Sequence, residues 1–471
     1  MPSRQDQLHS YQFTVQRAVA ALVMRETDPA QSPFRRLAGA GLASVLVAAI
    51  GLGGFALYGL FTGGGSTWRD PGAVIVEKES GARFVYREEK LHPVLNYASA
   101  LLIIGAEQPK TVLVSRRAID GVPRGLPLGI ADAPDSLPAK GRLSTAPWTV
   151  CSVATEADRT LPRSALLIGV TAGGGRGLGE DALLLRDPDG GLHLVWHQRR
   201  YLVRDPSRVL AALAATRARA VPVAPALLNS LPAGADLAPL ALPDEGERSA
   251  RVSGARIGDV YLVRNSGGGR QYAVALRDGL AGITELQAGL LLARTGQGEP
   301  EPITLGRFAA LPKLPDLAPT GPTAPPTAPP RLAAADGAGL CARVGDDGGV
   351  TEVRLGVRLP DLAAAPRTAP AAGGGVRADH VVVEPGRGAV VEAVASPGAA
   401  GGAVSVVTDL GRRYVLAGGE VLGALGYRDV RPVRLPASLV ALVPAGATLD
   451  PAAARVVAAG PGPGQSAGRS R

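Results

Sequence analysis

Hydrophobic residues form one unusually long uninterrupted stretch near the start of the chain. Residues 37–61 read LAGAGLASVLVAAIGLGGFALYGLF and contain no charged side chain. A helix needs about 20 apolar residues to cross the roughly 30 Å hydrocarbon core of a bilayer, so this stretch is long enough. It predicts one transmembrane helix that separates residues 1–36 from the much larger part of the chain that follows.

The residues before this stretch have apolar side chains at helical spacing. Intervals of three and four residues predict an amphipathic helix that ends before Pro29 and Pro33. This helix has two open interpretations, since it can lie on the bilayer surface or dock a partner. The apolar positions are Leu8, Tyr11, Val15, Ala18 and Leu22.

Two later segments alternate between apolar and polar residues, as half-buried strands do. They are residues 148–153 (WTVCSV) and 350–357 (VTEVRLGV). A weaker motif also recurs, in which Leu or Val precedes Pro, a glycine and a second Pro. It starts at Leu126, Leu231 and Val443, and at Leu314 in a form that lacks the glycine.

Strand-like and helix-like stretches precede the copies of this motif. Small units of this kind cannot bury their apolar faces alone, so we expect them to pack against a common core. The sequence predicts an α+β fold: a single transmembrane helix plus an elongated extracytoplasmic domain, with a β-rich core flanked by four small α/β repeats. The expected divisions are 1–36 (cytoplasmic arm with amphipathic helix), 37–61 (transmembrane helix), 73–139 (first repeat), 140–184 (first core segment), 185–240 (second repeat), 250–317 (third repeat), 318–338 (Pro-rich linker), 339–400 (second core segment), 401–452 (fourth repeat) and 453–471 (disordered tail).

The charges around the apolar stretch predict its orientation. Arg35 and Arg36 precede it directly, whereas the flank after it is uncharged as far as Arg69. Short segments rich in Arg and Lys stay in the cytoplasm, so we expect a cytoplasmic N-terminus and an extracytoplasmic C-terminal domain. A cleaved signal peptide is disfavoured, because the stretch is too long and lies too far from the start. Trp68 fits either an interfacial anchor or an ordinary core residue.

The amino-acid composition adds predictions about element length, charge and disulfide bonding. High Gly (62) and Pro (40) with only 4% aromatic residues predict many turns and short elements. The net charge of +9 comes mainly from arginine, and a general genomic bias toward arginine is the favoured explanation. Among binding partners, the charge favours anionic envelope polymers or an acidic partner over nucleic acid. Cys151 and Cys341 are the only cysteines, and an even pair in an oxidising compartment usually closes into a disulfide.

Motifs that carry catalytic or metal chemistry are mostly missing from the sequence. It contains no GxxxxGK[ST] phosphate loop and no GxSxG nucleophile turn. His193 and His197 form HxxxH, but in a strand they would stand about 13 Å apart, too far for one metal ion. The glycine run 173–177 is interpreted as a flexible loop. Residues 385–388 (PGRG) are interpreted as a hairpin turn, with an anion-binding backbone as the less favoured alternative. We therefore predict no catalytic residue, no cofactor and no metal ligand.

Taken together, these segments resemble the EccB family, the single-pass membrane component of the actinobacterial type VII secretion system. The resemblance covers nearly the whole length. It rests on the order of weak local matches around the single helix and the two cysteines. The matches are Tyr11-x-Phe13, 33–36 (PFRR), 129–134, 148–151, 181–203 with its Leu-Val-Trp centre, 340–341 and 381–388.

This resemblance implies a cytoplasmic arm, one membrane crossing and an elongated exterior domain locked by a disulfide between Cys151 and Cys341. It implies assembly in an inner-membrane complex with an FtsK/SpoIIIE-type motor ATPase (EccC), EccD, EccE and the mycosin protease. It also implies a homo-oligomer that scaffolds the export of small WXG100-type proteins. Members are sometimes labelled ATPases, which the missing phosphate loop argues against here. Two alternatives stay open: an exterior nucleotide or envelope hydrolase, and a tethered module that binds the cell envelope.

Overall fold

The computed structural model describes most of the chain. The described residues are 3–24, 33–62, 67–154, 162–265, 267–335, 339–345, 348–365, 367–371, 373–396, 398–399 and 401–458. Two long helices come first, α1 (Arg4–Met24) and α2 (Pro33–Thr62). The rest of the described chain forms five β-sheets with short helices between them, which confirms a mixed α+β fold.

Helix α2 contains the predicted apolar stretch. Within it, Ala38–Phe55 is long and apolar enough to cross a membrane, and none of that window is buried against the rest of the chain. A short 3-10 turn, η1 (Thr67–Arg69), then begins the sheets. Trp68 is only 2% exposed there and packs edge-on against Tyr86, so it is a core residue of the first sheet.

The largest sheet has six strands, and we call it the core sheet. Both segments with clear alternation lie in it, as predicted. The glycine run 173–177 also belongs to it, as an exposed edge strand, so its interpretation as a loop was wrong. In order across the sheet the strands are β19 (His380–Val383), β6 (Arg163–Ile168), β5 (Trp148–Val153), β17 (Gly339–Val344), β18 (Val350–Arg358) and β7 (Gly173–Gly177).

Four smaller sheets share one strand order. Three antiparallel strands follow one another, and a later strand pairs in parallel with the first of the three. The first sheet holds β1 (Ala73–Glu77), β2 (Arg83–Arg87), β3 (Lys90–Pro93) and β4 (Lys110–Val114). The second holds β8 (Leu183–Arg186), β9 (Leu192–Trp196), β10 (Arg199–Leu202) and β11 (Val221–Pro222). The third holds β12 (Val260–Arg264), β13 (Arg270–Leu276), β14 (Gly279–Ile283), β15 (Glu301–Ile303) and β16 (Lys313–Leu314). The fourth holds β20 (Ala389–Val394), β21 (Ala403–Val407), β22 (Arg413–Val415) and β23 (Val433–Pro436).

A proline carbonyl marks the same place in each small sheet. It accepts a hydrogen bond from the backbone of the third antiparallel strand, and the chain then continues alongside that strand. The motif copies at Leu231 and Val443 have this register. In the first sheet the residue before the equivalent proline is Val122, and in the third sheet it is Leu311. The sequence motif had put these two starts at Leu126 and Leu314, so both predicted starts were wrong. The four bonds are Leu91 N to Pro123 O, Arg200 N to Pro232 O, Leu280 N to Pro312 O and Arg413 N to Pro444 O.

The motif glycine is explained by what lies beneath it. A Cβ atom on Gly446 would stand 2.3 Å from Cε1 of Tyr414, and one on Gly234 would stand 2.2 Å from Cε1 of Tyr201. Gly125 lies against His92 in the same way. In the third sheet the large and small residues exchange places. Leu314 occupies the position of the motif glycine, and the residue paired with it is the small Ala281. One large and one small side chain thus share each site.

Substituting Gly446 by Ala tests this packing. The added methyl group has no room over the buried Tyr414 ring, and overpacking of this kind costs about 1–3 kcal/mol. We expect a lower urea midpoint with an unchanged slope. The matched control is Gly419→Ala, where no atom lies within 4 Å of the added Cβ and φ is −67°. Equal midpoints for the two variants would contradict the packing argument.

Short helices lie between the strands of the small sheets or follow their last strand. Helix α6 starts with a capping box of Thr284 and Gln287 and ends at Gly296, whose positive φ of 72° favours glycine. The helices are α3 (Tyr97–Ile104), α4 (Pro206–Ala212), α5 (Pro225–Ser230), α6 (Glu285–Thr295), α7 (Leu305–Ala310), α8 (Glu420–Ala424), α9 (Ala437–Val440) and α10 (Pro451–Ala454).

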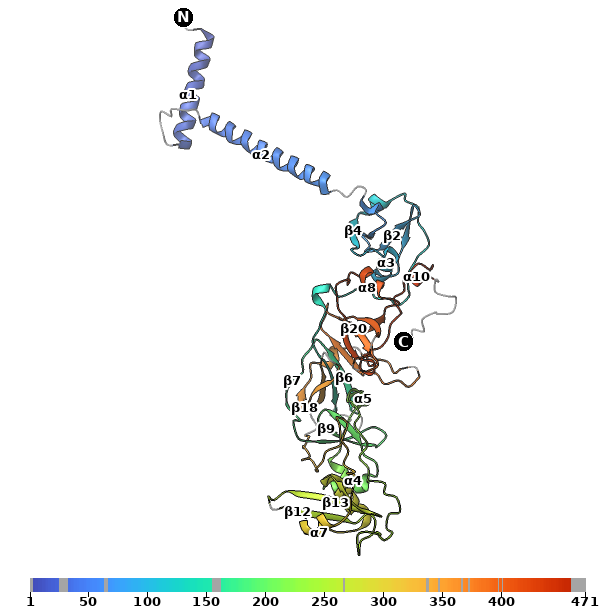
Figure 1. Cartoon of the computed structure of the whole chain (residues 1–471). Helices are drawn as coiled ribbons and strands as arrows, with labels where there is room; N and C mark the ends of the chain where they lie inside the picture. The colour runs from blue at the N-terminus through green and yellow to red at the C-terminus, as the bar shows by residue number, and fades with distance from the viewer. Residues whose placement is uncertain are drawn as a thin grey trace, which may run out of the picture.

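The sheets are stacked in a column (Figure 1). From the end nearest α2 the order is first sheet, fourth sheet, core sheet, second sheet and third sheet. The first and fourth sheets share one hydrophobic cluster that includes Leu102 and Tyr414. The second and third sheets share another, in which α4 meets α6 and Gly289 lets Ala212 approach closely. The core sheet packs against elements of both neighbouring sheets, so the domain is elongated.

Two observations differ from the expected divisions. Strand β20 falls in the range expected for the core, yet it hydrogen-bonds in the fourth sheet. The Pro-rich linker is not a free spacer, because Ala235 N donates to Thr323 O and Tyr201 Oη donates to Ala324 O. The linker therefore covers the edge of the second sheet before the chain returns to the core.

Candidate functional site

The disulfide joins the two halves of the core sheet. Cys151 on β5 lies directly opposite Cys341 on the antiparallel strand β17, with Cα atoms 4.0 Å apart. The two residues are 0% and 3% exposed. This confirms the predicted pairing across 190 residues of sequence. Since the second and third sheets lie within that loop, the bond closes a covalent ring around half of the domain.

A small cavity of about 110 Å³ lies next to the disulfide on the outer face of the core sheet. Cys341, Val170 and Val357 form its apolar side, and Arg343 and Arg354 form its polar side. The nearest acid is Glu352, whose Oε1 lies 3.6 Å from Arg354 Nε. The described residues contain no group of three His, Cys, Asp or Glu side chains that could hold a metal ion.

The two histidines of HxxxH have separate partners. His193 is buried on β9, with Nε2 3.2 Å from an oxygen of Asp187. His197 has a φ of 45° and lies in the turn after β9, stacked on Trp196, with Nε2 2.8 Å from Glu180. The assumption that one strand carries both residues was therefore wrong. Each histidine instead contacts its own carboxylate.

The segment 385–388 also differs from its expected role. It connects β19 of the core sheet to β20 of the fourth sheet, so it is not a hairpin turn. Gly386 has a φ of 71°, and its N–H donates to Asp409 Oδ2 at 2.7 Å. The backbone therefore does hold a carboxylate, and that carboxylate belongs to the same chain.

Contacts between sheets were not visible in the sequence. Arg412 of the fourth sheet donates from both terminal nitrogens to Asp132 of the first, each bond 2.7 Å long. Tyr427 Oη donates to Pro138 O at 2.6 Å, and burial raises the pKa of this phenol. About 280 residues separate these partners, so no local spacing pointed to them. These bonds fix the first sheet on the fourth.

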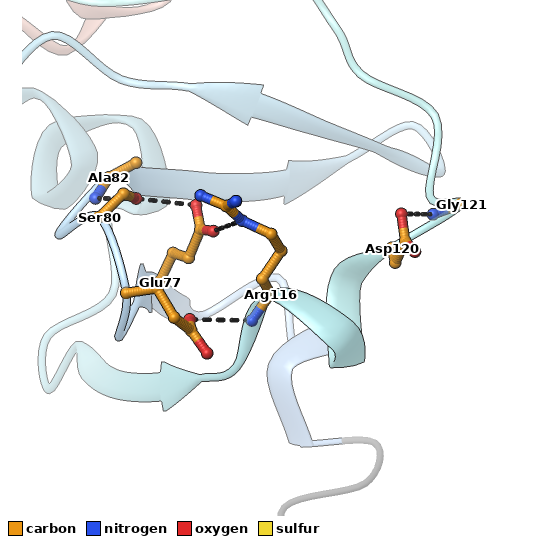
Figure 2. A network of polar contacts seen from close by, with 7 residues as sticks. Glu77, Ser80, Ala82, Arg116, Asp120 and Gly121 are labelled. Carbon is orange, nitrogen blue, oxygen red and sulfur yellow. Dashed lines mark hydrogen bonds and ion pairs between the residues drawn. The ribbon is translucent and has the colours of Figure 1, made fainter.

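A polar network fastens the strands of the first sheet (Figure 2). The Glu77 carboxylate accepts from Arg116 Nε at 2.7 Å and from Ser80 Oγ at 2.8 Å. Arg116 N also donates to Glu79 Oε2 at 2.9 Å. The Arg116 guanidinium, followed by the Ser80 hydroxyl, holds the pKa of Glu77 below its usual value. This network lies in the sheet that follows α2 directly.

Glu77→Gln tests the network through its pH dependence. A lowered pKa in the folded state stabilises that state above the unfolded glutamate pKa of roughly 4.3, and this stabilisation is lost as pH falls through the folded value. We expect the variant to have a lower Tm than wild type at pH 7, and we expect this gap in Tm to close as pH falls through the folded pKa of Glu77. The control is Glu299→Gln, an exposed residue with no ion-pair partner among the described residues. A constant gap at all pH values would contradict this role.

The residues predicted to meet the membrane and the cytoplasm are exposed where the structure describes them. On α1, Leu8 is 54%, Tyr11 71% and Leu22 84% exposed, so none of these side chains is buried. On α2, apolar residues such as Leu42 and Phe55 are 72% and 80% exposed. The side chains of Arg35 and Arg36 lie outside the described residues. Both helices thus present apolar surface that the rest of the described chain leaves uncovered.

Comparison with known proteins gives consistent matches. A family described as "Type VII secretion system ESX-1, transport TM domain B" matches residues 1–460. The chain is 29% identical over 474 residues to a protein of Mycolicibacterium smegmatis named "ESX-3 secretion system ATPase EccB3". The match covers 94% of this chain and 88% of that protein.

Solved structures agree over similar lengths. A chain of an intact ESX-5 inner membrane complex matches with a TM-score of 0.67 and 26% identity, covering 98% of this chain and 96% of that one. The structure of an EccB3 dimer from the ESX-3 core complex matches with a TM-score of 0.63 and 26% identity, covering 82% of this chain and all of that one.

Proposed function

Because the chain belongs to the EccB family of type VII secretion membrane proteins, it is a structural subunit of that secretion complex, and we propose how its segments divide the work. Residues 1–36 dock cytoplasmic subunits, α2 crosses the inner membrane, and the stacked sheets form an exterior scaffold. The order of three consecutive parts along the chain supports this division. A helix with exposed apolar residues comes first, an apolar span follows it, and an elongated domain comes last.

The orientation of the chain belongs to this proposal. Arg35 and Arg36 favour a cytoplasmic N-terminus by the positive-inside rule. The closed disulfide between Cys151 and Cys341 supports an oxidising compartment for the sheets. The charge bias and the disulfide are independent observations that favour the same orientation.

The four small sheets are, in this proposal, four copies of one repeat around the core. Their common strand order, the shared proline carbonyl and the paired large and small residues support it. The fourth repeat begins at β20, at residue 389, which shortens the core segment that precedes it. Val457 and Ala458, at the end of the described chain, also pair with the first repeat.

The chain assembles as a homo-oligomer within a larger membrane complex, as its relatives' structures indicate. We propose that its partners are the EccC-type motor ATPase, EccD, EccE and the mycosin protease, and that the cargo consists of small WXG100-type proteins. These assignments come from the family. A structural role fits the chain because its polar side chains link strands and sheets to one another.

An enzymatic role has less support. The names of the relatives include the word ATPase, but this sequence has no GxxxxGK[ST] motif to cradle phosphates. ATP turnover by the purified chain that a single substitution abolishes would favour the enzyme. A tethered envelope-binding module would instead be retained on isolated cell wall without any other subunit.

Affinity isolation from native membranes tests the assembly role. We expect a tagged full-length chain, solubilised in mild detergent, to copurify with the motor ATPase and the other membrane subunits as one large particle. Mass spectrometry of that particle identifies the partners. Recovery of the chain alone, under conditions that preserve other membrane complexes, would contradict the proposal.

A further inference from the structure

An arginine-lined cavity lies between the core sheet and the fourth sheet, away from the disulfide. Its volume is about 260 Å³. Arg367, Arg377 and Arg412 line it, and no carboxylate does. The rest of the lining is uncharged and includes Val381, Gly411, the proline and alanine at 444–445, and Leu410, which is 67% exposed.

The positive charge of this cavity is only partly compensated. Arg412 is paired with Asp132, but Arg367 and Arg377 form no ion pair with any described residue. Two nearby acids are engaged elsewhere, since Asp379 accepts from Ser164 and Asp409 accepts from Gly386. Arg377 also contributes to a lowered pKa for neighbouring Arg413, after the larger effect of burial. An anion entering the cavity would therefore meet two guanidinium groups without an ion-pair partner, of which Arg377 donates one hydrogen bond to Ala369 O.

The chain itself shows which anion this surface accepts. Arg412 holds the Asp132 carboxylate through two parallel hydrogen bonds. That carboxylate comes from a different sheet, so the contact resembles one between two molecules. Guanidinium forks favour carboxylates in this geometry, and charge-assisted pairs are among the stronger hydrogen bonds.

The edge beside the cavity has no main-chain partner among the described residues, and only the Arg412 side chain reaches it, donating to Ala445 O at 3.4 Å. The equivalent edge of the second sheet is covered. There, Ala235 N donates to Thr323 O of the Pro-rich linker. Ala447 occupies the equivalent position in the fourth sheet, one residue after the motif glycine, and its N–H has no partner among the described residues. Unpaired edges of this kind bind extended peptides by adding a strand.

We propose that this edge and cavity bind an extended acidic segment of a partner protein. The backbone of the segment pairs with residues 444–448, as the linker pairs with the second sheet, and one of its carboxylates enters the cavity between Arg367 and Arg377. The edge supplies affinity through the main chain, and the arginines select an acidic side chain. The proposal extends the scaffold role, because it assigns a docking place on the exterior domain.

Fluorescence anisotropy with the detergent-solubilised full-length chain tests this. The probe is a labelled peptide in which glutamate alternates with valine, and the comparison peptide has glutamine in place of glutamate. We expect the acidic peptide to bind at least tenfold more tightly, and Arg367→Glu with Arg377→Glu to remove that preference. The matched control is Arg264→Glu with Arg270→Glu, an exposed cross-strand pair that changes the net charge equally.

Main-chain pairing has its own readout. Two versions of the acidic peptide carry N-methyl groups on alternate amides, in the odd or the even positions. Strand addition predicts that one version loses binding and the other keeps it, because only alternate amides face the edge. Equal binding of both versions, or loss of binding in the Arg264 and Arg270 control, would overturn the proposal. Tight binding of polyphosphate without any binding of the acidic peptide would also overturn the proposal, because it would indicate a general anion site. Copurification of the whole complex is measured separately, so failure here leaves the scaffold role standing.

Discussion

Replacing Cys151 or Cys341 by alanine is expected to cause the largest loss of stability of any single substitution in the stacked sheets. The disulfide closes a loop of 190 residues, for which chain entropy alone gives about 5 kcal/mol at 25 °C. The paired strands β5 and β17 remain hydrogen-bonded without it, so we expect a loss of about 2–5 kcal/mol rather than complete unfolding. Urea denaturation of the solubilised chain, followed by tryptophan fluorescence, measures this loss.

The double variant separates the bond from ordinary packing. Each single substitution already breaks the disulfide, so Cys151→Ala with Cys341→Ala should cost little more than either one alone. Dithiothreitol should lower the wild-type midpoint to that of the variants and leave theirs unchanged. Additive losses, or a wild type insensitive to reduction, would show that the disulfide contributes little.

Charging the apolar face of α1 is expected to have the largest effect on assembly. Leu8 and Tyr11 are 54% and 71% exposed, and burying such a side chain contributes about 1.5–3 kcal/mol. If both bury against a partner, Leu8→Asp with Tyr11→Asp should reduce copurification of the motor ATPase at least tenfold. Membrane insertion should persist, because α2 is unchanged. The measurement is quantitative mass spectrometry of the tagged chain's complex.

A matched pair of substitutions on another face controls for added charge. Ser10→Asp with Gln16→Asp introduces the same two carboxylates at exposed positions that are neither three nor four residues from Leu8 or Tyr11. We expect these variants to copurify partners normally. If the Leu8 and Tyr11 variants also behave normally, α1 does not dock the motor, and its apolar residues serve the bilayer surface instead.

Features set by local sequence were predictable, and those set by pairing were not. The apolar stretch 37–61 and the alternation in 148–153 each follow from residue pattern alone, and α2 and β5 confirm them. The glycine run 173–177 has little intrinsic strand preference, and it becomes β7 only because β18 supplies hydrogen bonds. The sequence of this run alone therefore could not predict a strand.

The motif register shows the same limit. Pro123 and Pro127 both fit the pattern, and nothing local indicates that the Pro123 carbonyl is the one that faces Leu91. The compensation between Ala281 and Leu314 explains why the third sheet lacks the glycine, but it requires knowing which residues are opposed. For the same reason the contact between Arg412 and Asp132 emerges only from the fold.

The size of the membrane complex in cells that lack this chain tests the central claim most directly. Membranes from a deletion strain, and from the same strain with the chain restored, are compared by native electrophoresis together with export of WXG100-type proteins. We predict that the large complex and export are both lost on deletion and both return with the full-length chain. A complex of unchanged size with normal export in the deletion strain would contradict the assignment of this chain as a structural subunit.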